Sequence, residues 1–369
     1  MKKNILITTV GAPGFDSIFL SIKEWSKEFK IDINVIGVDA DQNALGKNFV
    51  DVWYQVPRAD VDYDGLKKSL KDIISKHDID LIVPIGDVEL EILENLDTRC
   101  AISSHSDFKI KNIQDKFYLY KLIQNSNDEA LKKLIPDFEC SNSYDVINSF
   151  ILKHINNDKF LCVKPRFTSG ARGVLKIIKD DDLDLEVFKK SKLGLIEVGY
   201  KKFLKSFATY SSTIEDFDYV LCEFLPGSEY SVDLYLQKSV SLAVSRKRVK
   251  ITSGICTEAL IDDPFELKNS ALKLAKYLGL VGNINMQFKQ DLYGNFKLLE
   301  INPRLSGAVV ACKAAGIDFV KLMLSYNFNK LNIEEIDSLK KQVTVAEENK
   351  NIMKRTYKEY FFVKDNLIQ

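Results

Sequence analysis

The chain has 369 residues, more than one hydrophobic core usually organises, so two or three packed units are expected. Its 52 basic and 52 acidic residues balance, which argues against a nucleic-acid-binding tail. The 6 cysteines form no CxxC pair and the 3 histidines do not cluster, so free thiols in a reducing cytosol are expected and a zinc site is not. No stretch approaches the ~20 apolar residues of a membrane span. We therefore expect a soluble, cytoplasmic protein without nucleic-acid or membrane partners.

Apolar strands alternate with amphipathic helices over the first part of the chain. The expected strands are residues 4–10, 33–38, 52–56 and 81–84, and the expected helices are residues 18–25, 63–76 and 88–96. This alternation predicts an α/β domain with a parallel sheet over residues 1–112. A dinucleotide-binding unit is the rival interpretation. Asp39 fits it, but Pro13 removes an N–H where the pyrophosphate needs donors, so NAD binding is not expected.

Two charged segments follow the fourth strand. The acidic residues Glu89 and Glu91, just after Asp87, are interpreted as an ordinary helix N-terminus favoured by the helix dipole. Asp115-Lys116 then opens another helix. A solvated lysine on a lysine-rich helix is one interpretation of Lys116, and a second one follows only from the resemblance described below.

The segment FLCVKPRFTSGAR, residues 160–172, predicts a strand that ends at Lys164 and leads into a loop of small residues. A lysine held at a strand end can meet phosphate as a point charge, and small residues let backbone N–H groups approach phosphate oxygens. The Walker A pattern GxxxxGK[ST] is absent. A plain β-hairpin with a flexible tip is the alternative.

A buried strand, Val220–Phe224, ends in Glu223 and is followed by Pro226-Gly227, which suits a type II turn. Backbone donors and acceptors beside Phe224 and Leu225 would suit an adenine edge in an apolar slot. The next predicted strands carry Glu229 and, on residues 240–249, Arg246. Basic residues on a strand are also common as simple edge protection.

The stretch VGNINMQFKQDLYGNFKLLEINPR, residues 281–304, predicts a β-hairpin with Gly294 supplying a positive φ at the turn. A symmetric turn would place Gln287 opposite Glu300. Alternation would then gather polar residues on one face, and Leu299 and Ile301 on the core face. Carboxylate and amide oxygens are ligands that Mg²⁺ accepts. A hairpin with one solvated polar face is the alternative.

The ordered combination of the Lys164 loop, ExLPGxEYSVD and Gln287…EINPR resembles ATP-grasp enzymes, most closely the carbamoyl-phosphate-synthase large-subunit type. The resemblance implies an α/β N-terminal (pre-ATP-grasp) domain with a parallel sheet, followed by the two α+β lobes of an ATP-grasp fold. The implied parts are residues 1–112, a small lobe with linking helices over 113–225, a large lobe over 226–330, and a C-terminal tail with a final strand over 331–369.

The resemblance also implies roles for single residues. Mg²⁺, as two ions with Mn²⁺ as a substitute, would be held by Gln287, Glu300 and Asn302. Arg304, Arg246 and Lys164 would act on the transferring phosphoryl group. The nucleotide would be bound by Lys116, Lys164, Ser169, Gly170, Gly173, Glu223, Phe224, Leu225, Glu229 and Gln287.

By the same resemblance, the chain would be an ATP-dependent ligase that joins a small-molecule carboxylate to an amine or a thiol through an acyl phosphate. A homodimer is the family-level expectation. Three alternatives stay open from the sequence. They are an enzyme that forms carboxyphosphate or carbamoyl phosphate from bicarbonate, a non-catalytic ATP-binding regulatory protein, and an interaction scaffold that has lost its site.

Overall fold

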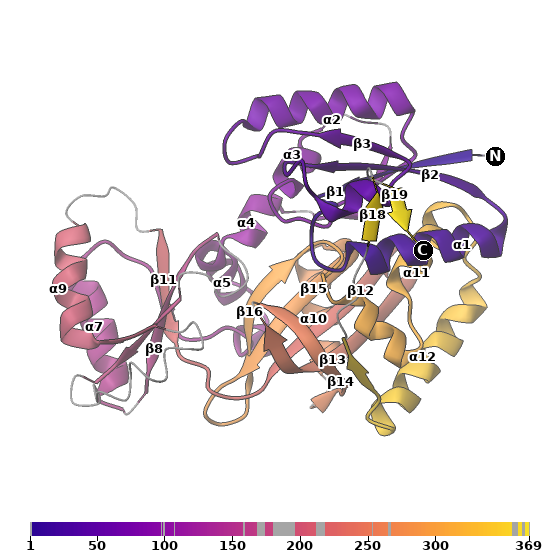
Figure 1. The fold of residues 1–369 in the computed structure, drawn as a ribbon. Coiled ribbons are helices and arrows are strands. Elements are labelled where there is room, and N and C mark those ends of the chain that lie inside the picture. Colours follow the sequence, from indigo (N-terminus) through magenta and orange to yellow (C-terminus); the bar gives the residue numbers. More distant parts are fainter. Residues whose placement is uncertain are drawn as a thin grey trace. The chain divides into compact units, whose positions relative to one another are not determined.

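The computed structural model describes residues 2–96, 98, 100–106, 108–157, 159–167, 174–179, 196–211, 218–252, 254–264, 267–355, 361–363 and 366–368. The chain divides into two compact units (Figure 1). Unit 1 comprises residues 1–111, 230–287 and 301–369, and unit 2 comprises residues 112–229 and 288–300. Each unit is described by itself, and the predicted division into four parts stays a prediction.

Unit 1 begins with a parallel five-stranded sheet in the order β3-β2-β1-β4-β5. Its strands are β1 (Lys2–Thr8), β2 (Asp32–Asp39), β3 (Val52–Gln55), β4 (Leu81–Val83) and β5 (Ala101–Ile102), and its helices are α1 (Phe15–Phe29), α2 (Tyr63–His77) and α3 (Leu90–Glu94). Ile5 and Ile7 pack into one core with α1, while Leu6 packs into a second core with α2. Burial on both faces explains the unbroken apolar run of β1. The predicted parallel α/β domain is confirmed.

A second, seven-stranded sheet has the order β16-β15-β12-β13-β14-β17, with β6 paired to β15. The pairs β12–β13, β13–β14 and β14–β17 are antiparallel. The strands are β6 (Ser104–His105), β12 (Glu229–Gln237), β13 (Val240–Thr252), β14 (Ile255–Ile261), β15 (Val281–Gln290), β16 (Phe296–Asn302) and β17 (Ile352–Lys354). The accompanying helices are α10 (Leu267–Tyr277), the 3-10 segment η5 (Val309–Ala315), α11 (Phe319–Asn327) and α12 (Ile333–Glu348).

The strand that the C-terminal tail adds to the seven-stranded sheet is β17, which precedes the segment predicted from the sequence, residues 357–363. Strand β17 pairs with β14, whereas β18 (Phe361–Val363) pairs with β19 (Asn366–Ile368) in a separate two-stranded sheet. The predicted final strand over residues 357–363 is therefore found at 361–363, and residues 357–360 lie outside the described residues.

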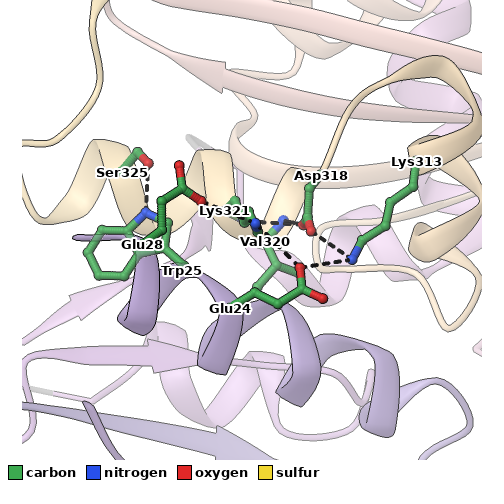
Figure 2. Close-up of polar contacts among 8 residues, drawn as sticks. All are labelled: Glu24, Trp25, Glu28, Lys313, Asp318, Val320, Lys321 and Ser325. Atoms are coloured by element: carbon green, nitrogen blue, oxygen red, sulfur yellow. Dashed lines mark hydrogen bonds and ion pairs between the residues drawn. The ribbon is translucent and has the colours of Figure 1, made fainter. Parts of the chain in front are cut away.

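Helices α1 and α11 pack against each other within unit 1, although they lie about 300 positions apart in the sequence. The indole of Trp25 is fully buried, and its Nε1 donates to Ser325 Oγ at 2.8 Å (Figure 2). Figure 2 also shows a polar rim, in which Glu24 and Glu28 pair with Lys321. The apolar core between these helices includes Ile5 of the parallel sheet, Leu242 of β13 and Ile261 of β14, so the N-terminal domain and these later strands share one core.

Unit 2 contains a sheet of order β10-β9-β8-β11-β7. The strands are β7 (Phe138–Glu139), β8 (Leu161–Pro165), β9 (Leu175–Ile178), β10 (Ile196–Gly199) and β11 (Tyr219–Glu223). The helices are α4 (Ile110–Gln114), which begins in unit 1, α5 (Lys116–Gln124), α6 (Glu129–Lys132), α7 (Tyr144–Ile155) and α9 (Tyr200–Ser211). Leu161, Val163 and Leu221 pack under α7 and α9 on one face. Alternation therefore places Cys162, Lys164 and Cys222 on the other face.

None of the helices within the described ranges is both long enough and apolar enough to cross a bilayer.

The Trp25–Ser325 contact gives a stability prediction. The variant Ser325→Ala leaves the buried Nε1 donor of Trp25 without its acceptor, so we expect a loss of about 1–3 kcal/mol in the free energy of unfolding. The urea midpoint measures it. As a matched control, Glu24→Gln breaks only partly exposed ion pairs and is expected to change stability by less than about 0.5 kcal/mol. Equal effects of the two variants would contradict this account.

Candidate functional site

Lys164 lies near the end of β8, on the face of the unit 2 sheet that is not covered by the apolar core. Its side chain is 8% exposed, and Nζ donates to the hydroxyl of Tyr120 at 3.0 Å. The Tyr120 hydroxyl in turn donates to the carbonyl oxygens of Leu298 and Leu299, at 3.1 and 3.0 Å. Tyr120 itself is completely buried.

The charge of Lys164 has no carboxylate partner among the residues that the structure describes. Burial by itself lowers the pKa of Lys164, but the nearby thiols of Cys222 and Cys162 and the Tyr120 hydroxyl outweigh burial and raise it. Lys164 is therefore a buried ammonium that donates to an uncharged hydroxyl. Such a position favours binding of an anion, because a buried charge is costly without a counter-charge.

Lys116 begins α5, directly after its N-cap Asp115. The side chain is 7% exposed, and Nζ lies 3.4 Å from the carbonyl oxygens of Pro165 and Arg166. Arg166 is fixed in turn by both carboxylate oxygens of Asp115. Burial excludes the interpretation of Lys116 as a solvated lysine and places it beside the segment that follows Lys164.

The predicted phosphate loop cannot be followed further. Ser169, Gly170 and Gly173 lie outside the described residues, so their role stays a prediction.

The predicted adenine hinge lies at the end of β11. The N–H groups of Glu223 and Phe224 already donate to the carbonyls of Asp137 and Phe160, at 2.9 and 2.8 Å. The Glu223 carbonyl has only a long contact from the Cys162 thiol, at 3.9 Å, and the N–H of Leu225, a residue 5% exposed, has no backbone partner among the described residues. A small pocket beside the hinge is lined by Lys159, Phe160, Glu223, Phe224, Asp291, Leu292 and Tyr293. Glu229 begins β12 and is half-buried.

The turn of the β15–β16 hairpin forms as predicted. Gly294 has φ 83°, and its N–H donates to the Asp291 carbonyl at 3.2 Å. The N–H of Asp291 donates to the Asn295 carbonyl at 2.9 Å. Pairing at the turn therefore joins Asp291 to Asn295, one residue short of the symmetric pairing expected from the sequence.

Side-chain alternation along β16 also differs from the prediction. Leu298 is fully buried and Leu299 is half-buried, so the expectation that Leu299 faces the core is wrong. Ile301 is buried at 2% exposure although it lies three residues from Leu298, and Glu300 is half-buried. Regular alternation is interrupted between Leu298 and Ile301, because one face of a strand carries every second residue.

The three predicted metal ligands have different surroundings. Asn302 is 4% exposed and Glu300 is half-buried. The Oε1 atom of Gln287 accepts from Nη1 of Arg248 at 2.7 Å, so only its second lone pair could meet a metal. Within the described ranges, no group of three or more His, Cys, Asp or Glu side chains could hold a metal ion. The predicted set has one carboxylate and two amides, so it is not a group of that kind and this absence does not bear on it. Its role stays a prediction.

Arg246 is 1% exposed and belongs to a buried polar network in unit 1. Its Nε donates to Asp233 at 2.7 Å, and its Nη2 donates to Ser306 Oγ at 3.3 Å. Asp233 also accepts from Asn285 at 2.7 Å and from the thiol of Cys312 at 3.4 Å. Nη1 of Arg246 is buried and has no partner among the described residues. The charge of the guanidinium is therefore balanced by Asp233, but its Nη1 has no hydrogen-bond acceptor among the described residues.

Arg304 is held by the carboxylate of Asp87, a residue to which the sequence analysis gave no role. Asp87 accepts from Nε and Nη2 of Arg304 at 2.7 and 2.9 Å, across 217 positions of sequence. Nη1 donates to the Leu305 carbonyl at 3.1 Å. A two-point contact of this kind fixes the plane of a guanidinium.

Glu89 does stand at the start of α3, yet its carboxyl group is more than a helix cap. Oε1 accepts from the hydroxyl of Thr9 at 2.5 Å, and the buried Oε2 has no partner among the described residues. Thr9 has φ 56°, which is rare for a β-branched residue. Burial, and then the charges of Asp39 and Asp87, raise the pKa of Glu89 against the opposing hydrogen bond from Thr9.

Several residues of these networks were not singled out from the sequence. Tyr120, Asp87, Asp233 and Arg248 each carry a contact that fixes a predicted site residue. The only signal for Asp87 was its position directly after a buried strand. In the sequence, Tyr120 cannot be told apart from the other buried residues on the apolar side of its helix, α5.

Two family models match this chain. Residues 5–106 match a PylC-like N-terminal domain, and residues 215–351 match the family described as ATP-grasp in the biosynthetic pathway with Ter operon. No curated protein matches the sequence.

Solved structures share the fold at low sequence identity. N5-carboxyaminoimidazole synthetase from Staphylococcus aureus, in complex with ADP, is 17% identical with a TM-score of 0.62, over 88% of this chain and 77% of that one. The biotin carboxylase domain of Hydrogenobacter thermophilus 2-oxoglutarate carboxylase, a dimer with MgADP and bicarbonate, is 16% identical with a TM-score of 0.61, over 88% and 69%. L-amino acid ligase from Bacillus licheniformis is 13% identical with a TM-score of 0.58, over 91% and 76%.

The raised pKa of Glu89 gives a prediction of pH dependence. A carboxyl group whose pKa is higher in the folded than in the unfolded chain stabilises the fold below its unfolded pKa of about 4.3. That stabilisation is lost as the pH rises through the folded pKa. We therefore expect Glu89→Gln to gain stability relative to the parent as the pH rises from about 4 towards neutrality. Urea midpoints across this range measure the difference. Glu91→Gln is the control, and parallel pH profiles for Glu89→Gln and the parent would refute the assignment.

Proposed function

We propose that this chain is an ATP-dependent ligase that joins a carboxylate to an amine or a thiol, because residues 215–351 match the model of an ATP-grasp family. The carboxylate oxygen attacks the γ-phosphorus of ATP, ADP leaves, and an acyl phosphate forms. The nucleophile then attacks the acyl carbon, loses its proton, and phosphate leaves. The fold shared with an L-amino acid ligase supports this reaction class.

The observation that carries the proposal is the buried ammonium of Lys164. It is 8% exposed, lies on the face of the unit 2 sheet opposite the core formed with α7 and α9, and donates only to a neutral hydroxyl among the described residues. Phosphate oxygens would supply the missing counter-charge. Lys116, which is 7% exposed and lies beside the segment after Lys164, is proposed as the second phosphate ligand.

The base of the nucleotide is assigned to the hinge after β11. The Glu223 carbonyl would accept from the exocyclic amine of adenine, and the Leu225 N–H would donate to a ring nitrogen. Phe224 contributes apolar surface, and Glu229 is proposed for the ribose hydroxyls. The proposed slot combines few polar groups with apolar walls, as small-molecule sites usually do.

The donor set of the hairpin fits Mg²⁺ in its chemistry. Glu300 offers a carboxylate, Asn302 a largely buried amide, and Gln287 the second lone pair of its amide oxygen. Mg²⁺ at these residues would offset charge on the phosphate oxygens, and a second ion bridged by Glu300 is part of the proposal.

The proposed catalytic arginines are already oriented by the protein. Asp87 fixes the guanidinium of Arg304, which is proposed to steady the phosphoryl group. Arg246 enters the proposal through Nη1, the buried nitrogen without a partner among the described residues. Preorganised donors stabilise developing charge without reorganisation during the reaction.

A second candidate uses bicarbonate as the carboxylate. Bicarbonate stands in the description of the 2-oxoglutarate carboxylase domain, which shares this fold. Stimulation of ATP hydrolysis by bicarbonate alone would favour this candidate, whereas a requirement for a larger carboxylate would favour the ligase. We further propose small-molecule substrates, a homodimer, and action in the cytoplasm, a compartment in which structural disulfides are rare.

The first test of the function is ADP release from a panel of carboxylates paired with amines and thiols. We expect release with at least one pair, and we expect Glu300→Gln to reduce it at least about a hundredfold, because a metal ligand would lose its charge. ATP binding by this variant should persist. The matched control Glu335→Gln, on the exposed side of α12, should keep full turnover. Normal ADP release from Glu300→Gln would overturn the metal assignment.

The second test concerns nucleotide binding alone. Lys164→Met removes the buried ammonium, and loss of one charged contact is expected to weaken ATP binding roughly 10- to 100-fold. Calorimetric titration of ATP with Mg²⁺ measures the change. Lys205→Met, at an exposed position of α9, is the control. Unchanged affinity in Lys164→Met would remove the main support for the proposed phosphate site.

A further inference from the structure

Two cysteines lie directly opposite each other on neighbouring strands of unit 2. Cys162 of β8 is paired with Cys222 of β11 in the antiparallel register. Directly opposed residues of such strands have Cα atoms about 4.5–5.5 Å apart, and a disulfide needs about 4.4–6.8 Å. The two side chains leave the same face of the sheet, because the residues are directly paired in this register. The pair therefore has the placement that a disulfide requires.

The surroundings favour a thiolate at Cys162. The hydrogen bond from Cys222 lowers the pKa of Cys162, and the charges of Lys164 and Lys289 add to this effect against burial and the charge of Glu223. Burial raises the pKa of Cys222. Cys162 is the half-buried member of the pair and Cys222 is buried at 1% exposure, so we assign Cys162 as the attacking thiol and Cys222 as the resolving thiol.

The pair also lies within the proposed nucleotide face. Cys162 stands two residues before Lys164 on the same strand, so both side chains point to the same side. Its Sγ lies 3.9 Å from the carbonyl oxygen of Glu223 at the hinge. The thiols are therefore placed between the group proposed for the phosphates and the group proposed for adenine.

We propose that Cys162 and Cys222 form a site of reversible oxidation by hydroperoxides, and that bound nucleotide protects this site. The Cys162 thiolate attacks the peroxide oxygen, the O–O bond breaks, and the alcohol or water leaves with a proton. The resulting sulfenic acid is attacked by the Cys222 sulfur, and water leaves as the S–S bond forms. The two thiols lose two electrons, which reduce the peroxide.

Protection by nucleotide follows from electrostatics and rests on the proposed function. Phosphate oxygens and the Cys162 thiolate compete for the same ammonium, Lys164. Binding of a phosphate chain therefore removes stabilisation from the thiolate and adds negative charge beside it, and both effects make the thiolate less available.

The experiment treats the full chain with hydrogen peroxide and maps its peptides by mass spectrometry. We expect a Cys162–Cys222 crosslink that a dithiol reductant reverses. Before oxidation, alkylation at pH 7 should be at least about tenfold faster at Cys162 than at Cys100, a half-buried thiol whose pKa is raised by burial. In Cys222→Ser, Cys162 should stop at a sulfenic acid that a 1,3-dione probe captures. Cys100→Ser is the matched control and should still form the crosslink.

Absence of the crosslink, or alkylation of Cys162 no faster than that of Cys100, would overturn the oxidation site. If Cys222→Ser fails to fold, peptide mapping of the parent chain decides alone.

Saturating ATP with Mg²⁺ should slow formation of the crosslink at least about tenfold, the change expected when one charged contact is lost. A crosslink that ATP does not slow, in a chain shown by calorimetry to bind ATP, would overturn the protection. A chain that forms the crosslink but binds no ATP would refute the proposed function and leave the oxidation site standing.

Discussion

A lysine ammonium, buried without a carboxylate in the described part of the chain, is the interaction on which the functional interpretation depends. Lys164 is 8% exposed and donates to the hydroxyl of Tyr120. A charge so placed is costly to the folded chain unless an anion completes its surroundings. The site is therefore electrostatically incomplete by itself, and phosphate is the chemistry that completes it. The charge of Lys164 also adds to the effect of Cys222 in lowering the pKa of Cys162, so anion binding and thiol reactivity share one contributing cause.

The buried cations of unit 1 follow the opposite pattern. Arg246 pairs with Asp233, and Arg304 pairs with Asp87 through two nitrogens. Each guanidinium is neutralised locally, so these contacts orient the side chain rather than leave its charge available. A group that is oriented and partly neutralised suits a role in stabilising charge that develops during a reaction, while an uncompensated ammonium suits tight binding of a charge already present.

The sequence was sufficient for the fold class and for the elements that carry the site. Continuous apolar strands predicted the parallel sheet, and the turn at Gly294 was predicted with its positive φ. Strand-face assignments were less secure. A one-residue offset at the Asp291–Asn295 turn, followed by an interruption before Ile301, changes which side chains face the core. Partners such as Tyr120 for Lys164, or Asp87 for Arg304, lie 44 and 217 positions away in sequence, where neither periodicity nor spacing carries a signal.

Tyr120 connects two parts of the proposed chemistry without any contribution from unit 1. Its hydroxyl accepts from Lys164 and donates to the carbonyls of Leu298 and Leu299, which directly precede Glu300 on β16. A buried hydroxyl that satisfies both a charged donor and a strand backbone fixes their spacing, because loss of either contact would leave a buried polar group unpaired. The lysine proposed for phosphate and the strand that carries the proposed metal carboxylate are therefore held in one arrangement inside unit 2. The packing of one side chain, Tyr120, can thus couple the position of the proposed phosphate ligand to that of the proposed metal ligand.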